Sequence, residues 1–305
     1  MASRVGFVIL SHRGTDWPLL ARLFPRLREL PEASIALHHD TYQSPLNREL
    51  IERYDVQVVP AVGRTSWSNI INVFATVAGL EVLFRQPRRP RWYVTLSQSC
   101  YPIKSASHIA KILDGLTDDF YIDMRLVNFQ ASHLLLDKYV EDAIRKYTLC
   151  HIPFISRYGR FYWRPLKIYR PRSVIPFRDG FYVFHGSNWL VLSECAVEYL
   201  LRQDIACHPV TEFYLTQYDQ QDDRQSPCPQ EIVIQSILGN ARELKGAYRN
   251  WHYIDWEGAK DWHPNVLTER HWSAIIASDA LWARKFDLEK SATLLKRIDT
   301  EILDT

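Results

Sequence analysis

Short apolar runs alternate with amphipathic stretches along the first 115 residues. Four of the runs are apolar and rich in β-branched or aromatic residues, as buried strands are. They cover residues 5–10, 33–38, 56–60 and 92–96. Residues at helical spacing fill the intervals, at 17–30, 69–83 and 105–113. This alternation predicts an α/β fold in which helices cover both faces of a mixed, mainly parallel sheet.

The second half of the chain is less regular. Apolar spacing predicts helices over residues 131–149, 194–202 and 289–303. Residues 180–193 resemble paired strands, whereas the polar residues 208–229 are typical of a surface loop. We expect Glu231 to begin a helix after Pro229, as we expect Asp16 to cap the first helix. No internal repeat divides the chain, so we expect a single domain over residues 1–305.

Composition narrows the class of protein. The 305 residues are 47% hydrophobic and 24% charged, as in a globular enzyme, and a net charge of +2 gives no support for a nucleic-acid partner. Five cysteines without CxxC spacing favour a reducing compartment over a zinc site or a disulfide framework. The Met-Ala-Ser-Arg start enters the first apolar run at once, so we expect no signal peptide or anchor and a cytoplasmic location.

Polar residues end three of the four predicted strands. They are Ser11-His12, His39-Asp40 and Ser97-Gln98. Parallel sheets bind ligands at the carboxyl ends of their strands, which predicts a nucleotide-type site here. The alternative for Asp40 and Ser97 is that each only caps a turn. Walker A, GxGxxG, HExxH and GxSxG motifs are absent, and no strict Asp-x-Asp triplet occurs.

A combination of short blocks gives the sharpest signal. Residues 96–105 read LSQSCYPIKS, which resembles the "LSG-x-DYP-[LI]-[KR]-[ST]" block of the core-2/I-branching glycosyltransferases (glycosyltransferase family 14, which includes peptide O-xylosyltransferases). Further blocks follow in that family's order, at residues 8–12, 35–40, 65–68, 186–193, 228–231, 253–256, 263–264 and 281–287. The resemblance runs from about residue 6 to residue 287, nearly the whole chain.

The resemblance implies a fold and a reaction. It implies a GT-A type fold, with residues 1–115 binding a nucleotide sugar and residues 116–305 binding the acceptor and carrying catalysis. The reaction is inverting transfer from a UDP-sugar to a glycan hydroxyl. N-acetylglucosamine is the best guess for the sugar, while related members use xylose or glucuronic acid. Glycoside hydrolysis would need two carboxylates across a sugar, and only one strong candidate is present.

The same resemblance assigns roles to individual residues. Glu231, in the Cys-Pro-Gln-Glu block, matches the general base, with Glu212 as its nearest rival. Arg284 and Lys285 match the basic residue that serves the diphosphate, so no metal ion or other cofactor is expected. His263 is a candidate for a second basic contact. Ser11, His12, Asp40 and Ser97 are further donor candidates, and the acceptor candidates are Gln98, Trp189 and Trp256, although most tryptophans belong to cores.

Three departures from the family pattern bear on the identity of the donor and of the acceptor. Cys100 stands in place of Asp, Gln230 replaces the Asp before the base, and Gly258 replaces an acceptor-side aromatic. They leave open a second hypothesis, a non-catalytic carbohydrate- or membrane-binding protein that kept the fold.

A basic and aromatic segment runs from Arg157 to Arg178, with seven cations and no acids. One interpretation is a solvated loop whose arginine stems pack on rings. The other is a surface for anionic groups, either of an anionic or lipid-linked glycan acceptor or of lipid headgroups. A surface for lipid headgroups predicts peripheral attachment to the inner membrane.

Overall fold

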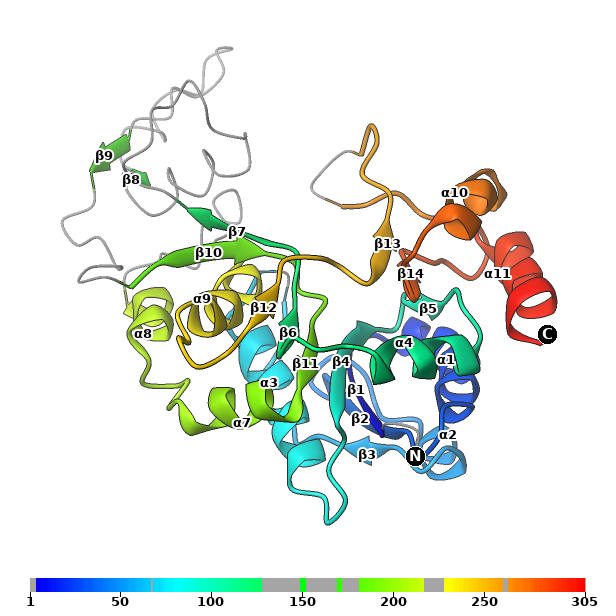
Figure 1. Cartoon of the computed structure of the whole chain (residues 1–305), viewed down its shortest axis with the longest axis horizontal. Helices are drawn as coiled ribbons and strands as arrows, with labels where there is room; N and C mark the ends of the chain where they lie inside the picture. The colour runs from blue at the N-terminus through cyan, green and yellow to red at the C-terminus, as the bar shows by residue number, and fades with distance from the viewer. Residues whose placement is uncertain are drawn as a thin grey trace.

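A seven-stranded sheet forms the centre of the computed structural model, which describes residues 4–66, 68–127, 149–151, 169–171, 181–216, 228–259 and 263–304. The strand order is β12-β6-β11-β4-β1-β2-β3 (Figure 1). The strands are β1 (Val5–Ser11), β2 (Ser34–His39), β3 (Gln57–Val58), β4 (Trp92–Ser97), β6 (Phe120–Tyr121), β11 (Val191–Ser193) and β12 (Gly246–Ala247). Strands β1 to β4 run parallel, and β11 lies antiparallel between β4 and β6. The predicted mixed, mainly parallel sheet of a GT-A type fold is confirmed.

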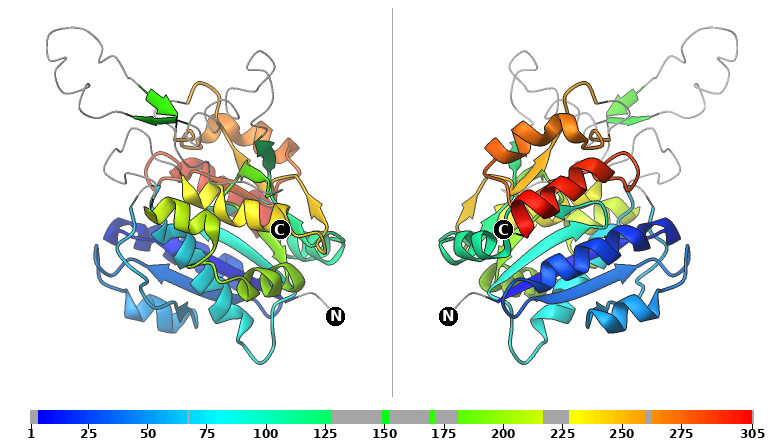
Figure 2. Two further views of the ribbon diagram at one scale, coloured as in Figure 1. Left: turned by 90° about the vertical axis from the view of Figure 1, so that its left-hand side faces the viewer. Right: turned by 90° about the vertical axis from the view of Figure 1, so that its right-hand side faces the viewer.

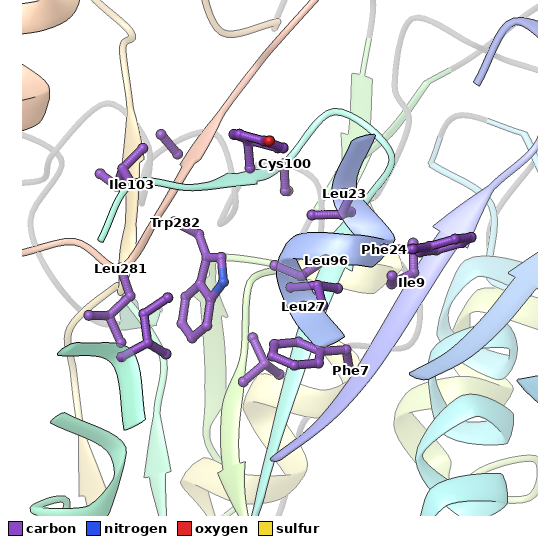
Figure 3. Close-up of a cluster of buried hydrophobic side chains, with 14 of the residues drawn as sticks. Phe7, Ile9, Leu23, Phe24, Leu27, Leu96, Cys100, Ile103, Leu281 and Trp282 are labelled. Carbon is purple, nitrogen blue, oxygen red and sulfur yellow. The ribbon is translucent and has the colours of Figure 1, made fainter. Parts of the chain in front are cut away.

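Helices cover both faces of this sheet (Figure 2). On one face lie α1 (Trp17–Arg28), α2 (Arg48–Arg53), α4 (Ala106–Asp114), α10 (Trp272–Ala277) and α11 (Ala292–Ile298). On the other face lie α3 (Ile71–Phe84), α7 (Glu194–Arg202), α8 (Pro209–Thr216) and α9 (Val233–Gly239). Side chains of a strand alternate between faces, so Phe7 and Ile9 pack in the first layer and Val8 in the second. Figure 3 shows Phe7 and Ile9 in one cluster with residues of α1 and with Trp282.

Three smaller sheets flank the main one. The first, of order β13-β14-β5, consists of β13 (His252–Ile254), β14 (Trp282–Arg284) and β5 (Tyr101–Pro102). The others pair β7 (Met124–Val127) with β10 (Val183–Gly186), and β8 (Leu149–His151) with β9 (Tyr169–Pro171). The amide of Phe286 donates to the carbonyl of Ser99 at 2.9 Å. The last block of the resemblance therefore lies against the loop that follows β4.

Two predictions for the second half are wrong. Residues 180–193 do not form one pair of strands, because β10 pairs with β7 while β11 joins the main sheet. Val191 and Leu192 of β11 are buried on opposite faces, which an isolated hairpin could not provide. Residues 209–216 form helix α8 instead of a loop, because Val210, Phe213 and Tyr214 recur at helical spacing and are buried.

Two helix starts also differ from prediction. The Asp16 carboxylate does not cap α1, since it accepts the backbone N–H groups of His12 and Arg13, each at 2.9 Å. Glu231 ends a 3₁₀ turn, Pro229–Glu231, and α9 begins only at Val233. Pro25 lies inside α1, which continues to Arg28. The predicted helix over residues 131–149 lies outside the described residues, apart from its last position in β8.

A close approach of α3 to β1 gives a stability prediction. A Cβ added at Gly79 would overlap the side chain of Val8, deep between the two elements. We expect Gly79→Ala to lower the free energy of unfolding by about 1–3 kcal/mol, measured by urea denaturation. Gly115→Ala is the control, because a Cβ there meets nothing closer than a carbonyl oxygen at 3.5 Å. Equal changes in both variants would contradict this packing.

Candidate active site

The carboxyl ends of β1, β2 and β4 lie together, as the sequence predicted. Leu10 is paired with Ser97, and Ser11 with His39. The Ser11 hydroxyl lies 2.7 Å from Nδ1 of His39, whose Nε2 lies 2.8 Å from the Ser44 hydroxyl. Ser11 is buried, and through His39 its hydroxyl is linked to Ser44 in the loop after β2. His12 lies at the same edge, and burial lowers the pKa of its imidazole although Asp16 opposes the shift.

Asp40 is fully buried and organises two loops. Its carboxylate accepts hydrogen bonds from the Tyr42 amide at 2.9 Å, the Gln43 side chain at 2.5 Å, and the amide and hydroxyl of Thr65 at 2.7 and 2.8 Å. Burial alone would raise the pKa of this carboxyl, but the hydrogen bonds from Gln43 and Thr65 outweigh it and lower the pKa. Asp40 therefore stabilises the turn after β2, which was one of the two alternatives from the sequence. The other alternative, contact with a donor, stays a prediction.

The loop after β4 surrounds a buried thiol. The Ser97 amide donates to Sγ of Cys100 at 3.4 Å, and the hydroxyls of Ser97 and Ser99 are 3.1 Å apart. Burial raises the pKa of the Cys100 thiol, which therefore stays neutral. Figure 3 shows Cys100 as a member of the buried cluster that contains Trp282. Gln98, half-buried, lies at the tip of this loop.

Arg284 and Lys285 lie in different surroundings. The Arg284 guanidinium lies 4.2 Å from the centre of the Trp189 ring and interacts with the Cys100 thiol. Burial lowers the pKa of Arg284, and the nearby Cys100 and Glu231 oppose the shift. Burial also lowers the pKa of Lys285, and the charges of Arg284, Arg13 and Lys290 lower it further, while Asp287 opposes the shift. The charge of Arg284 acts on Lys285, while the other neighbours of the two side chains differ.

An aromatic stack supports Arg284. The Trp189 ring lies 5.3 Å from the ring of His252, which in turn lies 5.7 Å from the ring of Trp282. Burial and the charge of Arg284 hold the pKa of His252 well below its usual value, so the imidazole is neutral. The backbone of Trp189 is fixed by Ser187, whose hydroxyl accepts its amide hydrogen at 3.1 Å.

Glu231 ends the 3₁₀ turn Pro229–Glu231, just before α9. The turn is anchored by the Cys228 amide, which donates to the Ser68 hydroxyl at 2.6 Å, and Cys228 itself has φ +45°. One Glu231 oxygen lies 3.6 Å from Nε2 of His185. The Glu231 side chain is 34% exposed whereas His185 is 5% exposed, so the carboxylate can meet a ligand.

Sequence reasoning missed two residues of this arrangement. His185 is the polar member of the fully buried strand Val183–Gly186, a placement that the apolar neighbours could have signalled. Arg13 follows Ser11 and His12 in the turn after β1, and its charge lowers the pKa of both His12 and Lys285.

The remaining candidates lie elsewhere. Glu212 is exposed on α8, and His263 is exposed in the segment before α10. Trp256 is 54% exposed in the loop after β13. Asp255 fixes that loop by accepting hydrogen bonds from His271 and Asn265 at 3.0 and 2.8 Å. Gly258 has φ +63° in the same loop, a conformation that favours glycine.

Several expectations cannot be placed. The segment from Arg157 to Arg178 lies outside the described residues except for Tyr169–Pro171. Among the residues that the structure describes, no three His, Cys, Asp or Glu side chains form a group able to hold a metal ion. Within the same ranges, the helices are too short or too polar to cross a bilayer.

Comparison with known proteins gives a family. The sequence profile described as "Branch: Core-2/I-Branching enzyme" matches residues 5–280. Two Arabidopsis thaliana proteins are similar over most of the chain. Beta-glucuronosyltransferase GlcAT14B is 23% identical over 98% of this chain and 66% of its own length. Beta-glucuronosyltransferase GlcAT14A is 24% identical over 85% of this chain and 53% of its own length. The chain therefore spans less than two thirds of both relatives.

Solved structures are more distant. Mouse xyloside xylosyltransferase 1 aligns over 94% of this chain and 99% of its own, with 10% identity and a TM-score of 0.40. The 4-diphosphocytidyl-2C-methyl-D-erythritol synthase of Anaerococcus prevotii aligns over 72% of this chain and 85% of its own, with 14% identity and a TM-score of 0.34.

Proposed function

This chain belongs to the core-2/I-branching family of glycosyltransferases, and we propose that it transfers a sugar, with inversion, from a UDP-sugar to a glycan hydroxyl. Glu231 is the general base. The observation that carries the proposal is the position of its carboxylate. The carboxylate is accessible and lies 3.6 Å from Nε2 of the buried His185, and its charge raises the pKa of Arg284. An accessible carboxylate of this kind can take the proton of an attacking hydroxyl.

The leaving diphosphate needs a positive partner. Lys285 is half-buried, and its neighbours at the end of β1 include His12 and the cationic Arg13. This turn also precedes the N-terminus of α1, where backbone N–H groups favour anions. Lys285 and Arg13 can therefore neutralise the charge that grows on the diphosphate, a task that other glycosyltransferases give to a metal ion.

Metal independence follows from this proposal. We expect transfer to continue at an unchanged rate in excess EDTA, because fixed cations stabilise the leaving group. The check is the initial rate of UDP release with EDTA, compared with the same preparation supplied with Mg²⁺ or Mn²⁺. A strict requirement for either metal would contradict the role of Lys285 and Arg13.

The donor sugar has three candidates. N-acetylglucosamine was the first choice from the family resemblance, with xylose and glucuronic acid as alternatives. The names of both relatives favour glucuronic acid, and a β-glucuronosyl product from an α-linked UDP-sugar requires inversion. The acceptor is proposed to be a glycan, anionic or lipid-linked. A cytoplasmic location with peripheral attachment to the inner membrane is a proposal that sedimentation with anionic liposomes tests.

A donor panel tests the proposed function against the non-catalytic alternative, which Cys100 in place of Asp favours. UDP and the three UDP-sugars should each raise the melting temperature, because a ligand that binds only the folded state stabilises it. At least one of the three sugars should also be transferred to a glycan. Binding without transfer or hydrolysis for every donor would support the alternative.

A further inference from the structure

A buried histidine lies beside the carboxylate of Glu231. Nε2 of His185 is 3.6 Å from one oxygen of that carboxylate, and the His185 side chain is 5% exposed. His185 belongs to β10, in which all four residues are buried. A polar side chain that is withdrawn from water in this way is unfavourable unless polar groups accompany it. The Glu231 carboxylate is one such group, which makes the contact a feature of the folded chain as well as of the site.

The two side chains come from segments that are tied together. Gln235 of α9 is fully buried, and its amide nitrogen donates to the carbonyl of Ser187 at 2.7 Å and to the carbonyl of Gln230 at 3.0 Å. Ser187 directly follows β10, and Gln230 directly precedes Glu231. One amide group therefore joins the end of the strand that carries His185 to the turn that carries Glu231. This link fixes the backbone on both sides of the contact.

The chemistry of the pair determines which atom donates. An ionised carboxylate has acceptor oxygens only, so the ring nitrogen that faces it carries a hydrogen whether the imidazole is neutral or charged. Nε2 of His185 is therefore a donor toward Glu231. At 3.6 Å the two atoms are beyond hydrogen-bond distance, and the partly exposed Glu231 side chain can rotate to close the gap when an acceptor binds.

We propose that His185 is a positioning residue for the general base. Its N–H holds one oxygen of the Glu231 carboxylate and leaves the other oxygen directed at the acceptor hydroxyl. That second oxygen takes the hydroxyl proton while the acceptor oxygen bonds to the anomeric carbon and the bond to the leaving UDP breaks. His185 keeps its own proton throughout. This inference rests on the proposed function and adds to it a residue that acts only through Glu231.

Two amide substitutions at position 185 differ mainly in reach. The side-chain nitrogen of glutamine can take the place of Nε2, whereas that of asparagine ends near the place of Nδ1 and falls short of Glu231. Because a misplaced base loses up to about 100-fold in rate, we expect His185→Asn to lower kcat by about 10–100-fold and His185→Gln to stay within about threefold of wild type. The dissociation constant of UDP, measured by calorimetry, should stay within a few-fold in both variants, which also shows that they are folded.

A measurement without turnover tests the contact itself. In protein labelled with ¹⁵N-histidine, the imidazole signals that are absent from His185→Gln belong to His185. The Nε2 resonance of His185 should move in Glu231→Gln, because the facing group loses its charge. It should stay in place in Glu212→Gln, whose side chain is exposed on α8.

The outcomes separate this inference from the proposed function. Equal kcat in His185→Asn and wild type, or equal losses in the asparagine and glutamine variants, would overturn the role of His185 and leave the proposed function intact. A His185 resonance that does not respond to Glu231→Gln would overturn it as well. Absence of transfer by the wild-type protein with every donor would instead remove the proposed function, and the role of His185 with it.

Discussion

Replacing Glu231 with glutamine is expected to abolish sugar transfer while UDP binding is retained. The amide has the shape of the carboxylate but cannot accept the proton of the acceptor hydroxyl. Loss of a general base lowers kcat by about 10²–10⁴-fold. The measurement pairs kcat for product formation with the dissociation constant of UDP.

Glu212 provides the matched control for this variant. It is a glutamate on α8 with an exposed side chain, and it was the rival candidate for the base. Glu212→Gln should retain full activity. Full activity in Glu231→Gln, or a loss confined to Glu212→Gln, would remove Glu231 from the role of base.

Replacing Lys285 with methionine is expected to have the second largest effect. The variant keeps much of the apolar stem but removes the charge that faces the diphosphate. We expect kcat to fall by about 10²–10³-fold, as when a preorganised electrostatic contact to developing charge is lost. UDP should also bind more weakly, which calorimetry measures.

Two further variants sharpen the test of Lys285. Lys285→Arg keeps a positive charge and should retain part of the activity, which a purely structural role would not explain. Lys111→Met, on the exposed surface of α4, should behave as wild type. Unchanged UDP affinity in Lys285→Met would contradict its assignment to the diphosphate.

The sequence was most informative where strands are long. Strands β1, β2 and β4 each contain six or seven residues and carry an apolar pattern, so the sheet and the meeting of Ser11 and Ser97 at one edge were predictable. Strands β5 and β14 have two and three residues and show no periodicity. The sheet that brings Arg284 to Cys100 could therefore not be foreseen from pattern alone.

Neighbouring residues in the sequence can have different contacts. Arg284 and Lys285 were predicted to act together on the diphosphate, and this role stays a prediction for both residues. In the structure Arg284 contacts Trp189 and Cys100, whereas Lys285 lies near the charge of Arg13.

The most direct test of the central claim is a transfer assay that follows UDP release and product mass together. Wild-type protein and Glu231→Gln are incubated in EDTA with a glycan acceptor and with the UDP derivatives of glucuronic acid, N-acetylglucosamine and xylose. We predict UDP release with a matching mass increase of the acceptor for wild type, greatest with UDP-glucuronic acid, and neither signal for Glu231→Gln. Equal product formation by Glu231→Gln, or no product from wild type with any donor, would contradict the claim that Glu231 catalyses glycosyl transfer.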